Sequence, residues 1–211
     1  MENNDLIWYK SVFEPGMSFS NSLWIAIHSQ ILNYVNIDNY IIRINKINNI
    51  INFKKDFGFI YNERNLNRLS TYLNYSMKKM DIRDFKIKIK EDNDILKAIN
   101  YMRNNRFLII GIPYYYIKKY TNYNMINIKE KIIQYFAAFS FNDYIILIPD
   151  MDIEEEKLDI STFCSKYMDI IKINYEKFVE LYKNIDDEYK RIVYVNVFNK
   201  NGIEIKSLTE F

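Results

Sequence analysis

Glycine, cysteine and histidine are scarce in this sequence of 211 residues. A phosphate-binding loop or a dinucleotide fingerprint needs closely spaced glycines, and the four glycines here are isolated from one another: Gly16, Gly58, Gly111 and Gly202. The single cysteine excludes a disulfide within the chain. One cysteine and one histidine also cannot supply the four ligands of a Cys/His zinc site. We therefore expect neither a metal nor a cofactor.

Charge of one sign and long apolar runs are also absent. The chain has 29 Lys and Arg against 27 Asp and Glu, and the resulting net charge of +2 is too small and too scattered to indicate a nucleic-acid partner. The first five residues are acidic and polar, whereas a secretory signal begins basic and continues apolar. No run approaches the roughly 18 to 20 apolar residues of a membrane span. The sequence thus predicts a cytoplasmic protein that binds neither nucleic acid nor membrane.

Isoleucine and asparagine, by contrast, are abundant, with 37 and 27 copies beside 19 tyrosines and 14 phenylalanines. We attribute this bias to an AT-rich genome rather than to function. Hydrophobic residues make up 49% and charged residues 27% of the chain, as in ordinary soluble globular proteins. A chain of this length predicts one domain over residues 1–211.

Local patterns predict the elements of the amino-terminal half. A strand over 5–13 should end at Pro15 and Gly16, which favour a turn. Capping residues at 18–21 precede apolar residues spaced four, four and three apart, which is typical of a helix running to Tyr34. Further expected elements are a helix over 40–53, a short strand or extended loop over 57–61, and a helix over 66–80. A half-exposed strand is expected over 85–90, where lysines alternate with apolar residues.

The carboxyl-terminal half is richer in strand signals. Asp92 or Asn93 should cap a helix over 95–102, and the apolar run 106–113 suits a strand buried on both faces. The remaining expected elements are a hairpin of strands 133–141 and 144–148, a helix capped near Ser161 that includes 178–182, and strands 191–198 and 203–207. Helices come first and most strands later, so the predicted class is α+β.

Three segments together carry a family pattern. Residues 18–37 match the start and continuation of a buried central helix, residues 107–117 match a buried strand followed by tyrosines, and residues 134–150 match a strand, a turn and a returning strand that ends in Asp. Over about residues 6–170 this order resembles the papain-like fold. More narrowly, it resembles the amino-terminal domain of butirosin biosynthesis protein H and the bacteriocin-processing cysteine peptidases. Residues 171–211 would then form a carboxyl-terminal helix and hairpin extension.

The resemblance implies a catalytic triad whose reactive residues are replaced in this chain. The family's nucleophilic Cys falls on Ser18, its His on Gln134 and its turn Gly on Ser140, while Asp150 keeps the place of the acidic orienter. A papain-type site pairs a thiolate with an imidazole that takes and returns a proton. Because Gln134 has no titratable proton near neutral pH, it cannot be a general base, and Ser18 without a base is a poor nucleophile.

The tyrosines Tyr114, Tyr115 and Tyr116 open a stretch of aromatic and basic residues over 114–123. Such a mixture can hold single-stranded nucleic acid, but the small net charge favours a partly exposed loop that forms one wall of a ligand pocket. Carboxylates over 150–156 lack the glycine and ligand spacing of a calcium loop, so we expect a solvated acidic turn there.

Neither remaining reactive side chain rescues the predicted site. His28 follows Ser18 by ten residues, which is about 15 Å along a helix, so we expect an ordinary helix residue. Cys164 has no basic neighbour in sequence to lower its pKa, and we expect a buried small hydrophobe rather than a nucleophile.

Two hypotheses on function follow. The first is a degenerate papain-like protein, similar to butirosin biosynthesis protein H, that keeps a ligand- or carrier-protein-binding cleft in a biosynthetic or peptide-processing pathway. The alternative is an active transferase that moves an acyl or aminoacyl group from a carrier-protein thioester to an amine. The resemblance implies an acyl- or peptidyl-carrier protein, or a biosynthetic enzyme, as partner. The sequence leaves open whether the protein forms a homo-oligomer.

Overall fold

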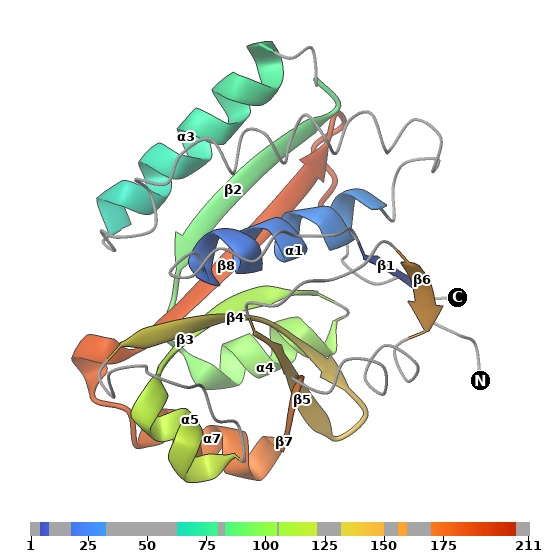
Figure 1. The fold of residues 1–211 in the computed structure, drawn as a ribbon. Coiled ribbons are helices and arrows are strands. Elements are labelled where there is room, and N and C mark those ends of the chain that lie inside the picture. Colours follow the sequence, from blue (N-terminus) through green and yellow to red (C-terminus); the bar gives the residue numbers. More distant parts are fainter. Residues whose placement is uncertain are drawn as a thin grey trace.

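The computed structural model describes residues 5–8, 18–32, 63–79, 83–104, 106–121, 132–149, 156–159 and 170–205 (Figure 1). Helices and antiparallel strands are mixed in these parts, which confirms the α+β class. The helices are α1 (Ser18–Leu32), α3 (Glu63–Lys79), α4 (Ile95–Arg103), α5 (Tyr114–Tyr120), α7 (Tyr175–Lys183) and the short 3₁₀ helix η2 (Asp187–Tyr189). The strands are β1 (Asp5–Trp8), β2 (Phe85–Glu91), β3 (Leu108–Pro113), β4 (Ile133–Phe141), β5 (Tyr144–Ile148), β6 (Glu156–Asp159), β7 (Ile171–Asn174) and β8 (Arg191–Asn199).

Six of these strands form one sheet in the order β2-β8-β3-β4-β5-β7, and every neighbouring pair is antiparallel. The last of the described strands in sequence, β8, lies between β2 and β3. A separate two-stranded sheet joins β1 to β6. Antiparallel pairing between strands far apart in sequence therefore organises the molecule.

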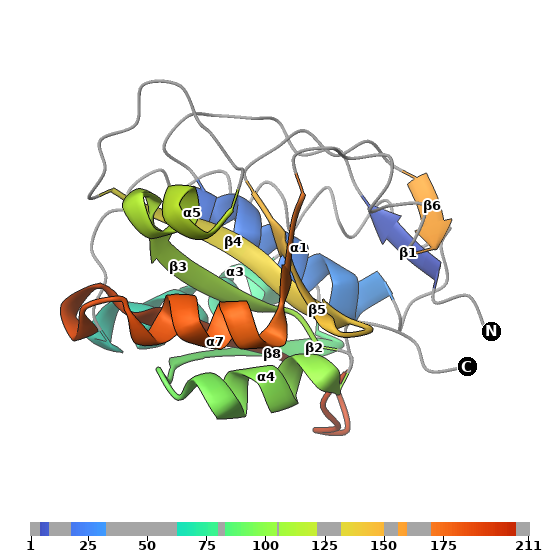
Figure 2. The same ribbon diagram turned by 90° about the horizontal axis from the view of Figure 1, so that it is seen from below.

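Helices cover both faces of the six-stranded sheet (Figure 2). Apolar residues of α1 and α3 pack against one face, which we call the α1 face. Residues of α4, α5 and α7 pack against the other, which we call the α4 face. Since successive residues of a strand point to opposite faces, each central strand contributes side chains to both cores.

The edge strand β2 follows the predicted alternation, with its apolar residues buried and its lysines exposed. Its free edge is closed by α3. The Asn74 carboxamide accepts a hydrogen bond from the Ile87 N–H (2.8 Å) and donates one to the Ile87 carbonyl (2.7 Å), while the Ser70 hydroxyl donates to the same carbonyl (2.7 Å). A side-chain amide thus takes the place of a neighbouring strand.

Most expected elements are confirmed, including the hairpin of β4 and β5. Phe141 pairs with Tyr144 across the two-residue turn, and Asn142 adopts a positive φ of 52°, a conformation that asparagine tolerates well. The expected segments 40–53 and 57–61, and the cap at Ser161, lie outside the described residues.

Four expectations are wrong in detail. Residues 171–174 form the strand β7 where the helix capped near Ser161 was expected to run, and α7 begins only after the cap at Asn174. The stretch from residue 114 begins with the helix α5, which follows Pro113 directly, rather than with a loop. Residues 203–205 form only an isolated bridge between Phe198 and Glu204, because Gly202 (φ 77°) turns the chain back for a few backbone hydrogen bonds. The cap of α4 is Asp94, one or two residues later than expected, and its carboxylate accepts from the N–H groups of residues 96 and 97.

Candidate functional site

The amino end of α1 lies against the start of β4. Ser18, the first residue of α1, is only 8% exposed, and its Oγ accepts a hydrogen bond from the backbone N–H of Tyr135 (3.3 Å). A serine at a helix start ordinarily uses its oxygen on the N–H groups of its own helix. Here that oxygen joins the helix to a strand that is 117 residues away in sequence.

Gln134, the expected partner of Ser18, points to the opposite face of the sheet. It pairs with Ile112 in the register of β3 and β4, and both Ile112 and its strand neighbour Phe136 pack on the α4 face. Paired residues, and residues two apart in a strand, share one face. The side chain that β4 presents beside Ser18 on the α1 face therefore belongs to Tyr135.

Tyr135 is a buried phenol in a tightly fitted position. Its ring meets the ring of Phe19 edge-on, with centroids 5.4 Å apart, and crosses Gly111 on the neighbouring strand. A Cβ at Gly111 would lie 2.6 Å from a carbon of the Tyr135 ring, so glycine makes room for it. Burial is the main cause that raises the pKa of Tyr135, with Glu91 adding to the rise and Arg191 opposing it. The phenol is thus protonated at neutral pH and is no general base.

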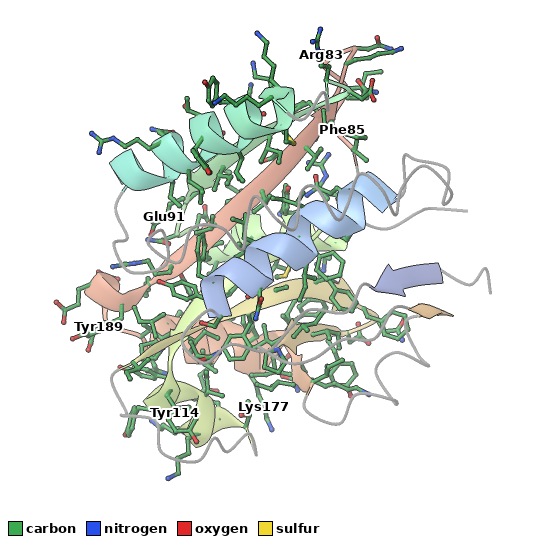
Figure 3. All side chains as sticks on the ribbon, turned by 45° about the horizontal axis from the view of Figure 1, so that its top comes forward. Arg83, Phe85, Glu91, Tyr114, Lys177 and Tyr189 are labelled. Atoms are coloured by element: carbon green, nitrogen blue, oxygen red, sulfur yellow. The ribbon has the colours of Figure 1, made fainter. Side chains whose placement is uncertain are left out.

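The predicted ligand-binding tyrosines form the first turn of α5. Tyr114, labelled in Figure 3, is buried. Its backbone N–H donates to the carbonyl of Ile132 just before β4. Tyr115 is 49% exposed and contacts the partly buried Tyr116 edge-on at 5.4 Å. Because Pro113 pairs with Ile133, this turn lies at the end of the sheet where β4 begins, as does the amino end of α1.

The other predicted residues are less informative. His28 lies within α1, as expected of an ordinary helix residue. Asp150 and Cys164 lie outside the described residues. Ser140 is on β4 and its hydroxyl forms a hydrogen bond with that of Tyr175, so it ties the hairpin to the start of α7.

An open groove on the α4 face, which extends past β2 to residues of α3, is a second candidate site, and the sequence did not indicate it. We call it the β2–β8 groove. Its volume is about 920 Å³, near the upper end of the range for small-molecule pockets. It is lined by Asn67, Ser70 and Thr71 of α3, Lys88, Ile89 and Lys90 of β2, Lys97, Asn100 and Tyr101 of α4, Asn104 and Arg106 just after α4, Tyr194, Asn196 and Phe198 of β8, and Glu204.

Strand pairing builds the floor of this groove. The lining residues Lys88 and Lys90 pair with Asn196 and Tyr194, and Lys86, which is outside the lining, pairs with Phe198. Paired side chains share one face. The ammonium groups lie over the rings, with Lys88 Nζ 5.0 Å from the centroid of Phe198 and Lys90 Nζ 5.3 Å from that of Tyr194. The alternating lysines were a visible signal, but their aromatic partners lie about a hundred residues later, so only the sheet reveals the combination.

The far wall of the groove is a polar cluster around Arg106. Its guanidinium forms an ion pair with Glu204 (2.8 Å) and lies over the ring of Tyr101 (5.1 Å). The amide of Asn196 donates to the Tyr101 hydroxyl (3.1 Å) and also bonds Glu204. Burial, together with Glu204, raises the pKa of Tyr101. Two buried polar atoms have no hydrogen-bond partner among the described residues: Arg106 Nε and the Tyr194 hydroxyl oxygen.

Comparisons with known proteins add no assignment: no family model, curated protein or solved structure matches the chain. Within the described ranges, no helix is long and apolar enough to cross a membrane. The same ranges contain no group of three or more His, Cys, Asp or Glu residues placed to hold a metal ion. The geometry of the two candidate sites is therefore the basis for inferring function.

Proposed function

We propose that this chain is a non-catalytic binding protein with a degenerate papain-like site, similar to the amino-terminal domain of butirosin biosynthesis protein H. The observation that carries the proposal is the state of Ser18. The residue at the nucleophile position is buried, and its hydroxyl oxygen accepts a hydrogen bond from the backbone of Tyr135.

A serine nucleophile needs a neighbouring group that removes its proton. The Tyr135 N–H that contacts Ser18 is a donor, and the Tyr135 phenol stays protonated because burial raises its pKa. Gln134 has no proton-accepting group of suitable pKa, and its side chain lies on the α4 face. General acid–base assistance is typically worth about a hundred- to ten-thousandfold in rate, and these side chains supply none of it.

Binding at this end of the sheet does not depend on that chemistry. The amino end of α1 carries a partial positive charge that favours carbonyl or anionic groups. The exposed ring of Tyr115 and the partly exposed ring of Tyr116 lie at the same end, beside the start of β4. A carrier-linked acyl group or a peptidic segment is the ligand class that the resemblance implies, with a carrier protein as the partner.

The test is to offer an acyl-loaded carrier protein and an amine acceptor to the wild type, Ser18→Ala and Tyr115→Ala. Ser22→Ala is the matched control, since Ser22 is a buried serine of the same helix. Mass spectrometry follows the thioester, and calorimetry follows binding. We expect binding without turnover, unaffected in Ser18→Ala and weakened in Tyr115→Ala. Turnover that disappears in Ser18→Ala but persists in Ser22→Ala would overturn the proposal and support the transferase.

A further inference from the structure

We propose that the β2–β8 groove binds a single strand of nucleic acid, with its phosphates on the lysines of β2 and a base against Phe198. This site lies at the β2 end of the sheet, mainly on the α4 face, whereas Ser18 and Tyr135 meet at β4 on the α1 face. The inference therefore stands whether or not the chain is a degenerate papain-like protein. It departs from the expectation drawn from net charge, because what matters for a strand is the charge along one face.

The lysines of β2 form a row that matches a backbone of repeated charge. Lys86, Lys88 and Lys90 are exposed, and residues two apart in a strand are about 6.8 Å apart. That spacing is close to the step between neighbouring phosphates in an extended single strand. In Figure 3 the labelled residues Phe85 and Glu91 mark the two ends of this row. Lys88 is in no ion pair within the described parts of the chain, so its charge is available to a ligand.

Phe198 supplies the stacking surface. Its ring is partly exposed on the floor of the groove, one strand away from the lysines, and the Lys88 ammonium lies 5.0 Å from its centroid. An aromatic ring beside a row of cations is the arrangement by which proteins bind single strands with little sequence preference. A base can stack on this ring while Lys88 turns from the ring to a phosphate.

Polar groups of the groove suit the edges of bases and the sugars. Asn67, Asn100 and Asn104 line its walls and are exposed, and each carboxamide both donates and accepts hydrogen bonds. Tyr194 is only 2% exposed, lines the same groove, and has a hydroxyl without a partner among the described residues. A buried polar group of this kind is ordinarily satisfied, so a ligand or water that reaches it gains a hydrogen bond.

The lining of the groove has more positive than negative side chains, which favours an anionic ligand. Lys88, Lys90, Lys97 and Arg106 face the groove together with one carboxylate, Glu204, which Arg106 already pairs. Lys97 is likewise paired, with Asp92 at the end of the groove where Asp94 caps α4. Glu204 lies beside Phe198 but is neutralised by Arg106, so Lys88 supplies a positive charge next to the ring that is unpaired among the described residues.

The test is fluorescence anisotropy with a labelled oligothymidylate of about ten nucleotides, within the range that one small binding fold covers. We expect the wild type to bind and Lys88→Gln to reduce the slope of log K against log salt by about 0.7. Phe198→Leu should weaken binding about 5- to 150-fold, and Phe198→Tyr should keep it, because the ring remains. Lys172→Gln is the control, since Lys172 is an exposed lysine on the opposite edge strand, β7.

Four results would overturn the inference. The first is no binding by the wild type at about 100 μM protein in low salt, the weak end for non-specific nucleic-acid binders. The second is binding that Lys88→Gln and Phe198→Leu leave equal to that of Lys172→Gln while circular dichroism reports folded proteins. The third is equal competition by polyglutamate of the same charge, which would indicate an acidic protein surface instead. The last is thymidine monophosphate binding as tightly as the oligomer.

Discussion

The carboxamide of Gln30 connects α1 to the middle of the sheet, and its removal has a calculable cost. Gln30 is 1% exposed; its Nε2 donates to the Val195 carbonyl (2.7 Å) and its Oε1 accepts from the Val197 N–H (2.9 Å). The pairing of β3 with β8 reaches only to Tyr194, so β3 does not lie beside residues 195–197 of β8. The Gln30 amide takes the place of a paired strand there. A helix side chain thus completes the hydrogen bonding of a buried strand.

Gln30→Met keeps the length and approximate volume of the side chain and removes both hydrogen bonds to β8, together with a third that Nε2 donates to the Ala26 carbonyl within α1 (2.8 Å). The Val197 N–H then has no partner at this position, and Val195 keeps only the longer bond from the Tyr101 hydroxyl (3.3 Å). An unsatisfied buried group costs about 1–3 kcal/mol, so we expect the free energy of unfolding to fall by about 3 kcal/mol. For a chain of this size that corresponds to a loss of about 6–12 °C in Tm.

The assay is urea denaturation followed by circular dichroism, with Ser29→Ala as the control. Ser29 is a buried polar residue of the same helix whose hydroxyl bonds only within α1, to the carbonyl of Ala26 (3.2 Å). The double variant Gln30→Met/Tyr101→Phe should lose more than the sum of the single losses, because the Val195 carbonyl then loses both donors. A loss below about 0.5 kcal/mol for Gln30→Met, or strict additivity in the double variant, would refute the reasoning.

Two further predictions concern the edge of the sheet and its buried phenols. Asn74→Ala removes both carboxamide hydrogen bonds to Ile87 and should lower the free energy of unfolding by about 1–2 kcal/mol. It should also increase light scattering, because the unpaired edge of β2 becomes available to other chains. An unchanged free energy of unfolding together with unchanged scattering would contradict this. At alkaline pH, stability should be full below about pH 10, the pKa of a tyrosine in the unfolded chain, and should fall above it, since the unfolded chain releases protons that the folded chain keeps. Tyrosinate absorbance and circular dichroism should then change together, and smooth ionisation of a chain that stays native would contradict the expectation. Burial is the main cause that raises the pKa of the four phenols concerned: Tyr101, Tyr135, Tyr182 and Tyr194.

The sequence predicted an element correctly where a few neighbouring residues are enough to determine its structure. The start of α1 near Ser18, the alternation in β2 and the two-residue turn at Asn142 were all predictable, because each is a property of a few neighbouring residues. The helix α5 was not readable from its run of three tyrosines, which have a modest helix propensity. Tertiary contacts of Tyr114 and Ile117, both buried, hold it in place.

The candidate sites needed the pairing of distant strands. A shift of one residue along β4 decides whether residue 134 or residue 135 faces α1. The family pattern did not locate the strand to within one residue, so it could not decide between them. The β2–β8 groove likewise arises from the pairing of Lys88 with Asn196, which no local pattern encodes. Sequence reasoning therefore found the position of Ser18 but neither its true neighbour, Tyr135, nor the second site.

The central place of β8 has a consequence for how the chain is made. During synthesis β2 and β3 leave the ribosome long before residues 191–199, and until those residues arrive β2 has no partner in the six-stranded sheet. Until β8 is made, the edges of β2 and β3 that pair with it stay unpaired, and the apolar faces of α1 and α3 lack part of their packing. Such delayed closure is slow and prone to aggregation. A nascent chain halted before residue 191 should therefore be a client of chaperones, whereas one released after residue 205 can close its sheet.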